Sequence, residues 1–143
     1  MILIDANILL YAHNSSSEHH SAAARWLEKA FSGDAPVCLT WMTILAFLRI
    51  ATNSHIFPHP LSATQAAKIV SGWLEQPCVS VINPGERHWE ILSKLLGTAQ
   101  ARGPLVMDTH LAALAIENGA VLYTSDQDFT RFPGLRTKNP LQR

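Results

Sequence analysis

The chain has 143 residues, of which 48% are hydrophobic and 15% are charged. This is enough apolar material for the core of one domain, and it excludes a disordered chain. Eleven basic and eleven acidic residues cancel to a net charge of zero. A globally basic nucleic-acid-binding protein is therefore excluded, and any contact with nucleic acid must use local patches. We expect a cytoplasmic protein with two buried, reduced cysteines, no signal peptide and no membrane-spanning segment.

Short apolar runs alternate with amphipathic stretches along the chain. The pattern predicts four strands, at 2–4, 37–39, 79–82 and 121–123. It predicts helices between them, at 17–31, 41–52, 62–74, 85–99 and 108–118, and short helical turns at 7–11 and 126–129. Residues 133–143 are expected to form a proline-rich basic tail. Strands that alternate with helices predict an α/β fold with a parallel sheet.

Three of the five aspartates stand at the ends of predicted strands or at the start of a helix. Asp5 follows the first strand directly, Asp126 follows the last strand by two residues, and Asp108 opens a helix after an apolar run. Taken alone, Asp108 or Asp126 would serve well as a helix N-cap. Because ligand sites of parallel sheets lie beyond the carboxyl ends of the strands, we expect the three carboxylates to converge. Crowded carboxylates repel one another unless a cation neutralises them, which predicts a Mg²⁺ or Mn²⁺ site that activates water against a phosphodiester.

Several stretches resemble one known family. The opening ILIDAN of residues 2–7, LVMDTHLAALA of residues 105–115 and YTSDQDF of residues 123–129 look like a PIN domain, and more narrowly like the VapC-type ribonuclease toxins of bacterial toxin–antitoxin pairs. FLRIATN of residues 47–53 and RHW of residues 87–89 resemble a branch that is abundant in mycobacteria. The resemblance covers nearly the whole chain in order.

The resemblance implies a single PIN domain over residues 1–143, with a three-layer α/β/α fold around a parallel sheet of four to five short strands. It implies an endoribonuclease toxin that depends on Mg²⁺ or Mn²⁺ and cuts a translation-related RNA such as tRNA or rRNA. A cognate VapB-type antitoxin would neutralise the toxin, and the chain would form a homodimer. The RNA substrate, the antitoxin and the homodimer rest on the resemblance alone.

The resemblance also assigns roles to particular residues. Asp5, Asp108 and Asp126 match the catalytic, metal-binding acids of the family, and Asn7 and Asp128 match positions that support the site. Arg49 stands beside the acids on its helix, where it would hold the scissile phosphate or tie down a carboxylate.

Position 46 departs from the family pattern. The family places a glutamate immediately before Phe-Leu-Arg, whereas this chain has Ala46 there. Ala46 also falls within the polar stripe of its helix, beside Thr43, Arg49 and Asn53. The alanine is either the natural residue of a variant that lost a ligand or a substitution that silences a toxic enzyme, and the intact state of the other motifs favours the second. In both cases we expect this chain to be impaired.

Other features have plainer interpretations. His19, His20, His55 and His59 are expected at the surface and His110 in packing. The four tryptophans are expected in the core. The basic residues after Phe129 are either a solvated end or contacts to an RNA backbone; they are Arg131, Arg136, Lys138 and Arg143.

Two other classes of function compete with a ribonuclease toxin. The first is a catalytically silent PIN-like module that only binds RNA or an antitoxin, and Ala46 is the residue that supports it. The second is a phosphoryl-transfer domain with an acidic pocket. That class would place a second aspartate two residues after Asp5, where this chain has Asn7.

Overall fold

The computed structural model describes residues 1–142 of the chain. Its strands are β1 (Ile2–Ile4), β2 (Val37–Leu39), β3 (Val79–Val81), β4 (Val121–Tyr123) and β5 (Arg136–Lys138). Its helices are α1 (Ala6–Ala12), α2 (His20–Ser32), α3 (Trp41–Ala51), α4 (Ala63–Leu74), α5 (His88–Thr98), α6 (Leu105–Glu117) and the 3₁₀ helix η1 (Gln127–Arg131). The α/β fold class predicted from the sequence is confirmed.

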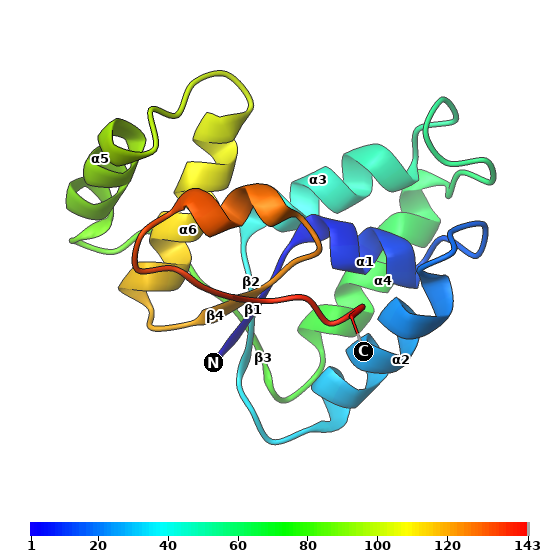
Figure 1. The fold of residues 1–143 in the computed structure, drawn as a ribbon. Helices are drawn as coiled ribbons and strands as arrows, with labels where there is room; N and C mark the ends of the chain where they lie inside the picture. Colours follow the sequence, from blue (N-terminus) through cyan, green and yellow to red (C-terminus); the bar gives the residue numbers. More distant parts are fainter. Residues whose placement is uncertain (143) are drawn as a thin grey trace.

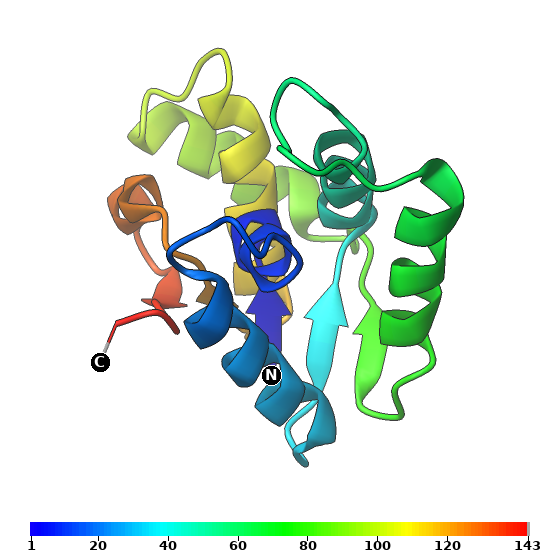
Figure 2. The ribbon, with the colours of Figure 1, turned by 90° about the vertical axis from the view of Figure 1, so that its right-hand side faces the viewer.

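The five strands form one parallel sheet in the order β3-β2-β1-β4-β5. Helices cover both faces of the sheet, with α5 and α6 on one side and α1, α2 and α4 on the other (Figure 1). Seen after a quarter turn, β1, β2 and β3 run in the same direction, and α1 and α3 begin where β1 and β2 end (Figure 2). The carboxyl ends of these strands therefore share one edge with the amino-terminal ends of two helices.

The two faces of the sheet carry two separate hydrophobic cores. Ile4 and its neighbours pack toward α1, α2, α3 and α4, whereas Leu3 and Cys38 pack with α5 and α6. Successive side chains of a strand point to opposite faces, so a three-residue strand buried on both faces serves both cores. This arrangement explains why β1, β2 and β4 are uninterrupted apolar runs, and it fixes the register that places Asp5 at the end of β1.

Helices α2 and α5 begin at His20 and His88, three residues later than predicted. Two further differences concern the start of α6 and the basic tail. Helix α6 begins at Leu105, so Asp108 lies in its first turn and is no N-cap; the preceding Gly103 has a φ of 61°, and Pro104 fits the start of a helix because it needs no amide partner there. The basic tail is also structured in part. Residues 136–138 form β5 and pair with β4, Arg136 opposite Val121 and Lys138 opposite Tyr123.

The tryptophans are only partly in the core. Trp73 is buried and Trp26 stacks on Tyr123, but Trp41 and Trp89 are 52% and 69% exposed, so the prediction was wrong for these two. In α5 the buried positions are His88, Ile91 and Leu95, a phase that leaves Trp89 facing outward. No helix within residues 1–142 is long and apolar enough to cross a membrane.

Candidate active site

The order of the sheet brings two chain segments together at its carboxyl edge. β1 and β4 are neighbours, so Asp5 after β1 lies beside Thr124–Asp126 after β4. The backbone amide of Asp5 donates to the carbonyl of Tyr123 at 3.0 Å, which extends the pairing of the two strands by one step. The Asp5 carboxylate also caps α1, because its Oδ1 accepts from the amide of Ala6 at 2.7 Å. Asp5 is therefore held on both sides.

The hydroxyl of Thr124 connects three groups of the site. Thr124 is buried, and its Oγ1 donates to Oδ2 of Asp5 at 2.7 Å. The same oxygen accepts from the amide of Asp126 at 3.0 Å and from Nδ2 of Asn7 at 3.3 Å. One donor and two lone pairs are then all in use. Sequence reasoning missed this residue, although its place directly after a strand and two residues before an acid was a usable signal.

The carboxylates influence one another. Burial, followed by the negative charges of Asp126, Asp5 and Asp128, raises the pKa of Asp108 from 3.8 to about 6, and Arg131 opposes this rise. Burial also raises the pKa of Asp5, against the hydrogen bonds from Thr124 and Ala6. Asp126 caps η1 by accepting from the amide of Asp128 at 2.9 Å. The helix-capping role predicted for Asp108 and Asp126 is thus confirmed for Asp126 and wrong for Asp108, whereas Asp5, for which it was not predicted, also caps a helix.

We expect Asp108→Asn to stabilise the fold above about pH 6 when no divalent cation is present. The folded pKa exceeds the ordinary value of 3.8, so the stability due to the protonated carboxyl is complete below pH 3.8 and is lost as the pH rises through about 6. Because solvent screens this half-exposed group, the gain near pH 7.5 should be about 1 kcal/mol. Urea unfolding in EDTA across this pH range measures it. The exposed Asp34→Asn is the control, and a loss of stability in Asp108→Asn at high pH would contradict the expectation.

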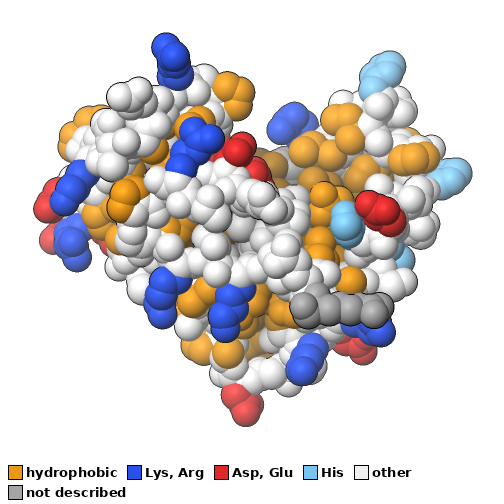
Figure 3. Space-filling model, in the orientation of Figure 1, with side chains coloured by type: hydrophobic (Ala, Val, Ile, Leu, Met, Phe, Trp, Pro, Cys, Tyr) orange, Lys and Arg blue, Asp and Glu red, His pale blue; other side chains and the backbone are white. Residues whose placement is uncertain are grey.

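A groove of about 650 Å³ adjoins Asp5 and Asp108. Its opposite wall is α3, which contributes Leu45, Ala46 and Arg49. The position at which sequence comparison expects a glutamate therefore does line the site, next to two of the acids. The surface has a notch between the part that carries α5 and α6 and the part that carries α3, with acidic side chains at its base (Figure 3).

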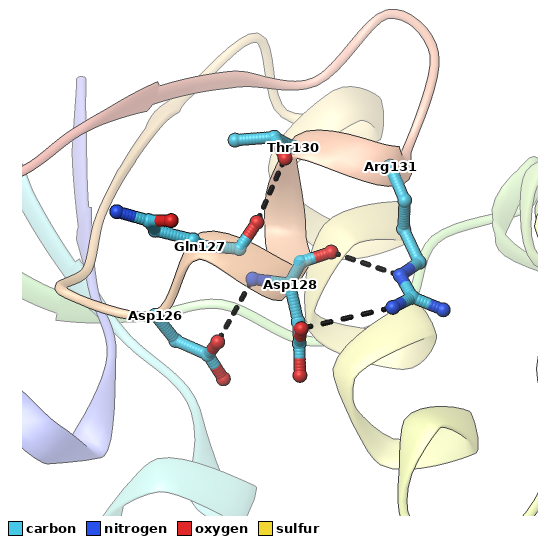
Figure 4. A network of polar contacts seen from close by, with 5 residues as sticks. All are labelled: Asp126, Gln127, Asp128, Thr130 and Arg131. Atoms are coloured by element: carbon cyan, nitrogen blue, oxygen red, sulfur yellow. Dashed lines mark hydrogen bonds and ion pairs between the residues drawn. The ribbon is translucent and has the colours of Figure 1, made fainter.

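Some basic side chains lie near the acids. The basic residues predicted in the tail lie at different places in the structure. Within residues 1–142 no ion pair links Arg49 to a carboxylate, so the second role predicted for it finds no support. Nη2 of Arg131 lies 3.6 Å from Oδ1 of Asp128 (Figure 4). Arg136 donates to the carbonyl of Gly119, at the end of the sheet away from the acids. Lys138 is the strand neighbour of Tyr123, at the carboxyl edge where the acids lie. Arg143 lies outside the described residues.

The donor chemistry of the site fits a divalent cation. All candidate ligands are oxygens, the carboxylates repel one another, and Oδ1 of Asn7 is a buried acceptor without a hydrogen-bond partner among residues 1–142. Over the same residues, no three His, Cys, Asp or Glu side chains are placed so that they could hold an ion as they stand. That Asp5, Asp108 and Asp126 bind one divalent cation together thus stays a prediction. His110 pairs with His88 at 3.0 Å and contributes to packing, as predicted.

Comparisons with known proteins match the whole chain. The sequence profile of the PIN domain matches residues 2–135. Ribonuclease VapC37 of Mycobacterium tuberculosis (strain ATCC 25618 / H37Rv) is 44% identical over 140 residues, which cover 98% of this chain and 97% of that protein. The structure of VapBC-1 from nontypeable Haemophilus influenzae matches with a TM-score of 0.72 and 20% identity, covering 99% of this chain and 100% of that chain. Mycobacterium tuberculosis VapC20, described as a sarcin-ricin loop cleaving toxin, matches with a TM-score of 0.67 and 19% identity, covering 95% and 99%.

Proposed function

Because the chain belongs to the PIN-domain family and, within it, to the VapC ribonucleases, we propose that it is an endoribonuclease toxin that depends on Mg²⁺ or Mn²⁺. The observation that carries this proposal is the acidic edge of the sheet. Asp5 and Asp126 are joined through Thr124, and the pKa of Asp108 is raised by burial and, next, by the charges of Asp126 and Asp5. Such an edge favours a cation, and a cation at an open groove suits a polyanionic substrate.

The side chains of the site divide the work between them. Asp5, Asp108 and Asp126 would hold the cation. A bound cation would lower the pKa of a water molecule and offset negative charge on the phosphate. Thr124 keeps the Asp5 carboxylate in place, and Asn7 bonds to the same hydroxyl. Arg49, exposed on the groove and free of carboxylate partners within residues 1–142, is suited to contact a phosphate of the strand.

Partner and substrate follow from the relatives. A solved structure of the same fold from Klebsiella pneumoniae, with a TM-score of 0.66 and 19% identity, is described as a toxin–antitoxin complex, and VapC20 is described as cleaving the sarcin-ricin loop. For this chain we accordingly propose a VapB-type antitoxin as the partner and a structured, translation-related RNA, rRNA or tRNA, as the substrate. Both would be met in the cytoplasm.

The alternative of a catalytically silent module rests on Ala46. An alanine at the wall of the groove supplies no oxygen ligand, and the acids do not form a group of three ligands within residues 1–142. A cleavage assay on total bacterial RNA, titrated with Mg²⁺ or Mn²⁺, tests the two functions. Slow cleavage that EDTA abolishes supports the nuclease. Binding of RNA without cleavage at any metal concentration supports the silent module.

Self-association is the remaining part of the proposal. Trp41 and Leu45 on α3, Met107 on α6 and Trp89 on α5 are each more than half exposed, and a second copy that covered them would remove apolar surface from water. We expect the isolated chain at micromolar concentration to scatter light as a particle of twice its mass of 15.8 kDa. A mass of 15.8 kDa at every concentration would contradict a homodimer.

A further inference from the structure

A second hollow lies beside the acids, between η1 and β5. It has a volume of about 300 Å³, at the lower end of the range for small-ligand sites. All its lining residues are polar, and those that matter for its chemistry are Thr124, Asp126, Gln127, Thr130, Lys138 and Asn139. It has no aromatic side chain on which a base could stack, so a ligand would be held by hydrogen bonds and charge.

This hollow is continuous with the acidic edge through two residues. Thr124 and Asp126 both line it, and Thr124 is the residue whose hydroxyl bonds to Asp5 in the groove on the other side. The wall formed by β5 is fixed in place, because the amide of Thr124 donates to the carbonyl of Lys138 at 3.0 Å. The hollow therefore adjoins the place where the acids would meet a phosphate of a nucleic-acid strand.

Two side chains of the hollow have polar groups to spare. Lys138 is exposed and forms no ion pair within residues 1–142. The amide of Gln127 makes no hydrogen bond over the same residues, and it extends on the opposite side of η1 from Asp128 and Arg131 (Figure 4). Thr130 is already engaged, because its hydroxyl donates to the carbonyl of Gln127 at 2.7 Å. The 3₁₀ helix η1 thus presents the side-chain amide of Gln127 on one side and the ion pair of Asp128 and Arg131 on the other.

We infer that this hollow holds the nucleotide adjacent to the cleaved phosphate, with the Lys138 ammonium on a backbone phosphate and the Gln127 amide on the edge of the base. The inference rests on the proposed function, because it takes RNA as the ligand. A lysine contact to phosphate supplies affinity without regard to sequence, whereas an amide with both a donor and an acceptor can distinguish bases.

Binding of fluorescein-labelled, single-stranded RNA of random sequence, measured by fluorescence anisotropy over a series of salt concentrations, tests the lysine. The chain as it stands is used, because we expect Ala46 to limit cleavage. For Lys138→Gln we expect weaker binding and a log–log salt slope shallower by about 0.7, the value for one lost phosphate contact on a single strand. Lys138→Arg should restore the slope. Arg136→Gln, on the same strand but at the opposite edge of the sheet, should leave it unchanged.

A selection experiment tests the glutamine. RNAs recovered from a random pool by the parent chain should be enriched in one base at one position. Gln127→Ala should lose that preference, on the order of tenfold, while keeping the salt slope. Failure of the parent to bind RNA would overturn the proposed function and this inference together. Binding by the parent with a salt slope unchanged in Lys138→Gln, or changed equally in Arg136→Gln, would overturn the inference alone.

Discussion

Ala46→Glu is expected to convert this chain into an active, metal-dependent ribonuclease. Ala46 is half-buried on α3 and lines the groove together with Asp5 and Asp108, so a glutamate there would add a fourth carboxylate to the wall that now lacks one. The added oxygens should tighten binding of Mn²⁺ and help to place the attacking water. Removal of one positioned electrostatic group from a catalytic site costs about 10²–10³-fold in rate, and we expect a gain on the order of 10–1000-fold from its return.

The matched control is Ala46→Gln, which has the size and oxygen of glutamate but not its charge. If charge at the metal is what matters, the glutamine variant should bind Mn²⁺ less tightly than the glutamate variant and cleave total RNA far more slowly. The glutamate variant should also be toxic when expressed in a bacterial host. A glutamate variant that folds, binds Mn²⁺ and cuts no RNA at millimolar metal would favour the silent module over the nuclease.

The same substitution should lower stability when no metal is present. A fourth negative charge beside Asp5 and Asp108 adds repulsion to a site whose carboxyl pKa values are already raised. Divalent cations should restore the loss, because a ligand that binds only the folded state stabilises it. The stability of Ala46→Gln should respond less to Mn²⁺.

The sequence predicts the acidic edge because topology and strand position determine it together. An apolar run followed at once by an aspartate leaves few alternatives in a parallel sheet, and Asp5 and Asp126 lie where the pattern places them. The start of α6 was less predictable, because a strong N-cap preference for aspartate competes with the weaker signal of Gly103 and Pro104. Asp108 nevertheless reaches the site from the first turn of that helix.

Features that depend on contacts between distant segments were not predicted. β5 contains Arg136 and Lys138, which are typical of a solvated tail, and it becomes a strand because β4 offers it a free edge. The outward position of Trp89 follows from a phase of α5 in which His88 is buried and meets His110, a contact that no periodicity shows. In both cases tertiary pairing overrides the local pattern.

Thr124→Val is expected to destabilise the chain by about 2–3 kcal/mol and to lower Tm by roughly 5–10 °C, because it leaves buried polar groups without their partner. Valine has nearly the shape of threonine, so packing is kept. What is lost is the hydroxyl that donates to Asp5 and accepts from the amide of Asp126 and from Asn7. Calorimetry or urea unfolding of the variant beside the parent measures the effect.

The pH dependence of that loss identifies its origin. The hydrogen bond from Thr124 lowers the pKa of Asp5, which burial raises, so the valine variant should raise this pKa further. A carboxyl with a raised folded pKa destabilises the fold once it is ionised, and this cost is absent below the ordinary value of 3.8. The deficit of Thr124→Val should therefore grow as the pH rises from 4 to 8, while Thr124→Ser, which keeps the hydroxyl, should show a smaller deficit with little pH dependence. No deficit in Thr124→Val beside a clear deficit in Thr124→Ser would mean that Thr124 acts through its methyl group alone, and Asp5 would then need another group to hold it.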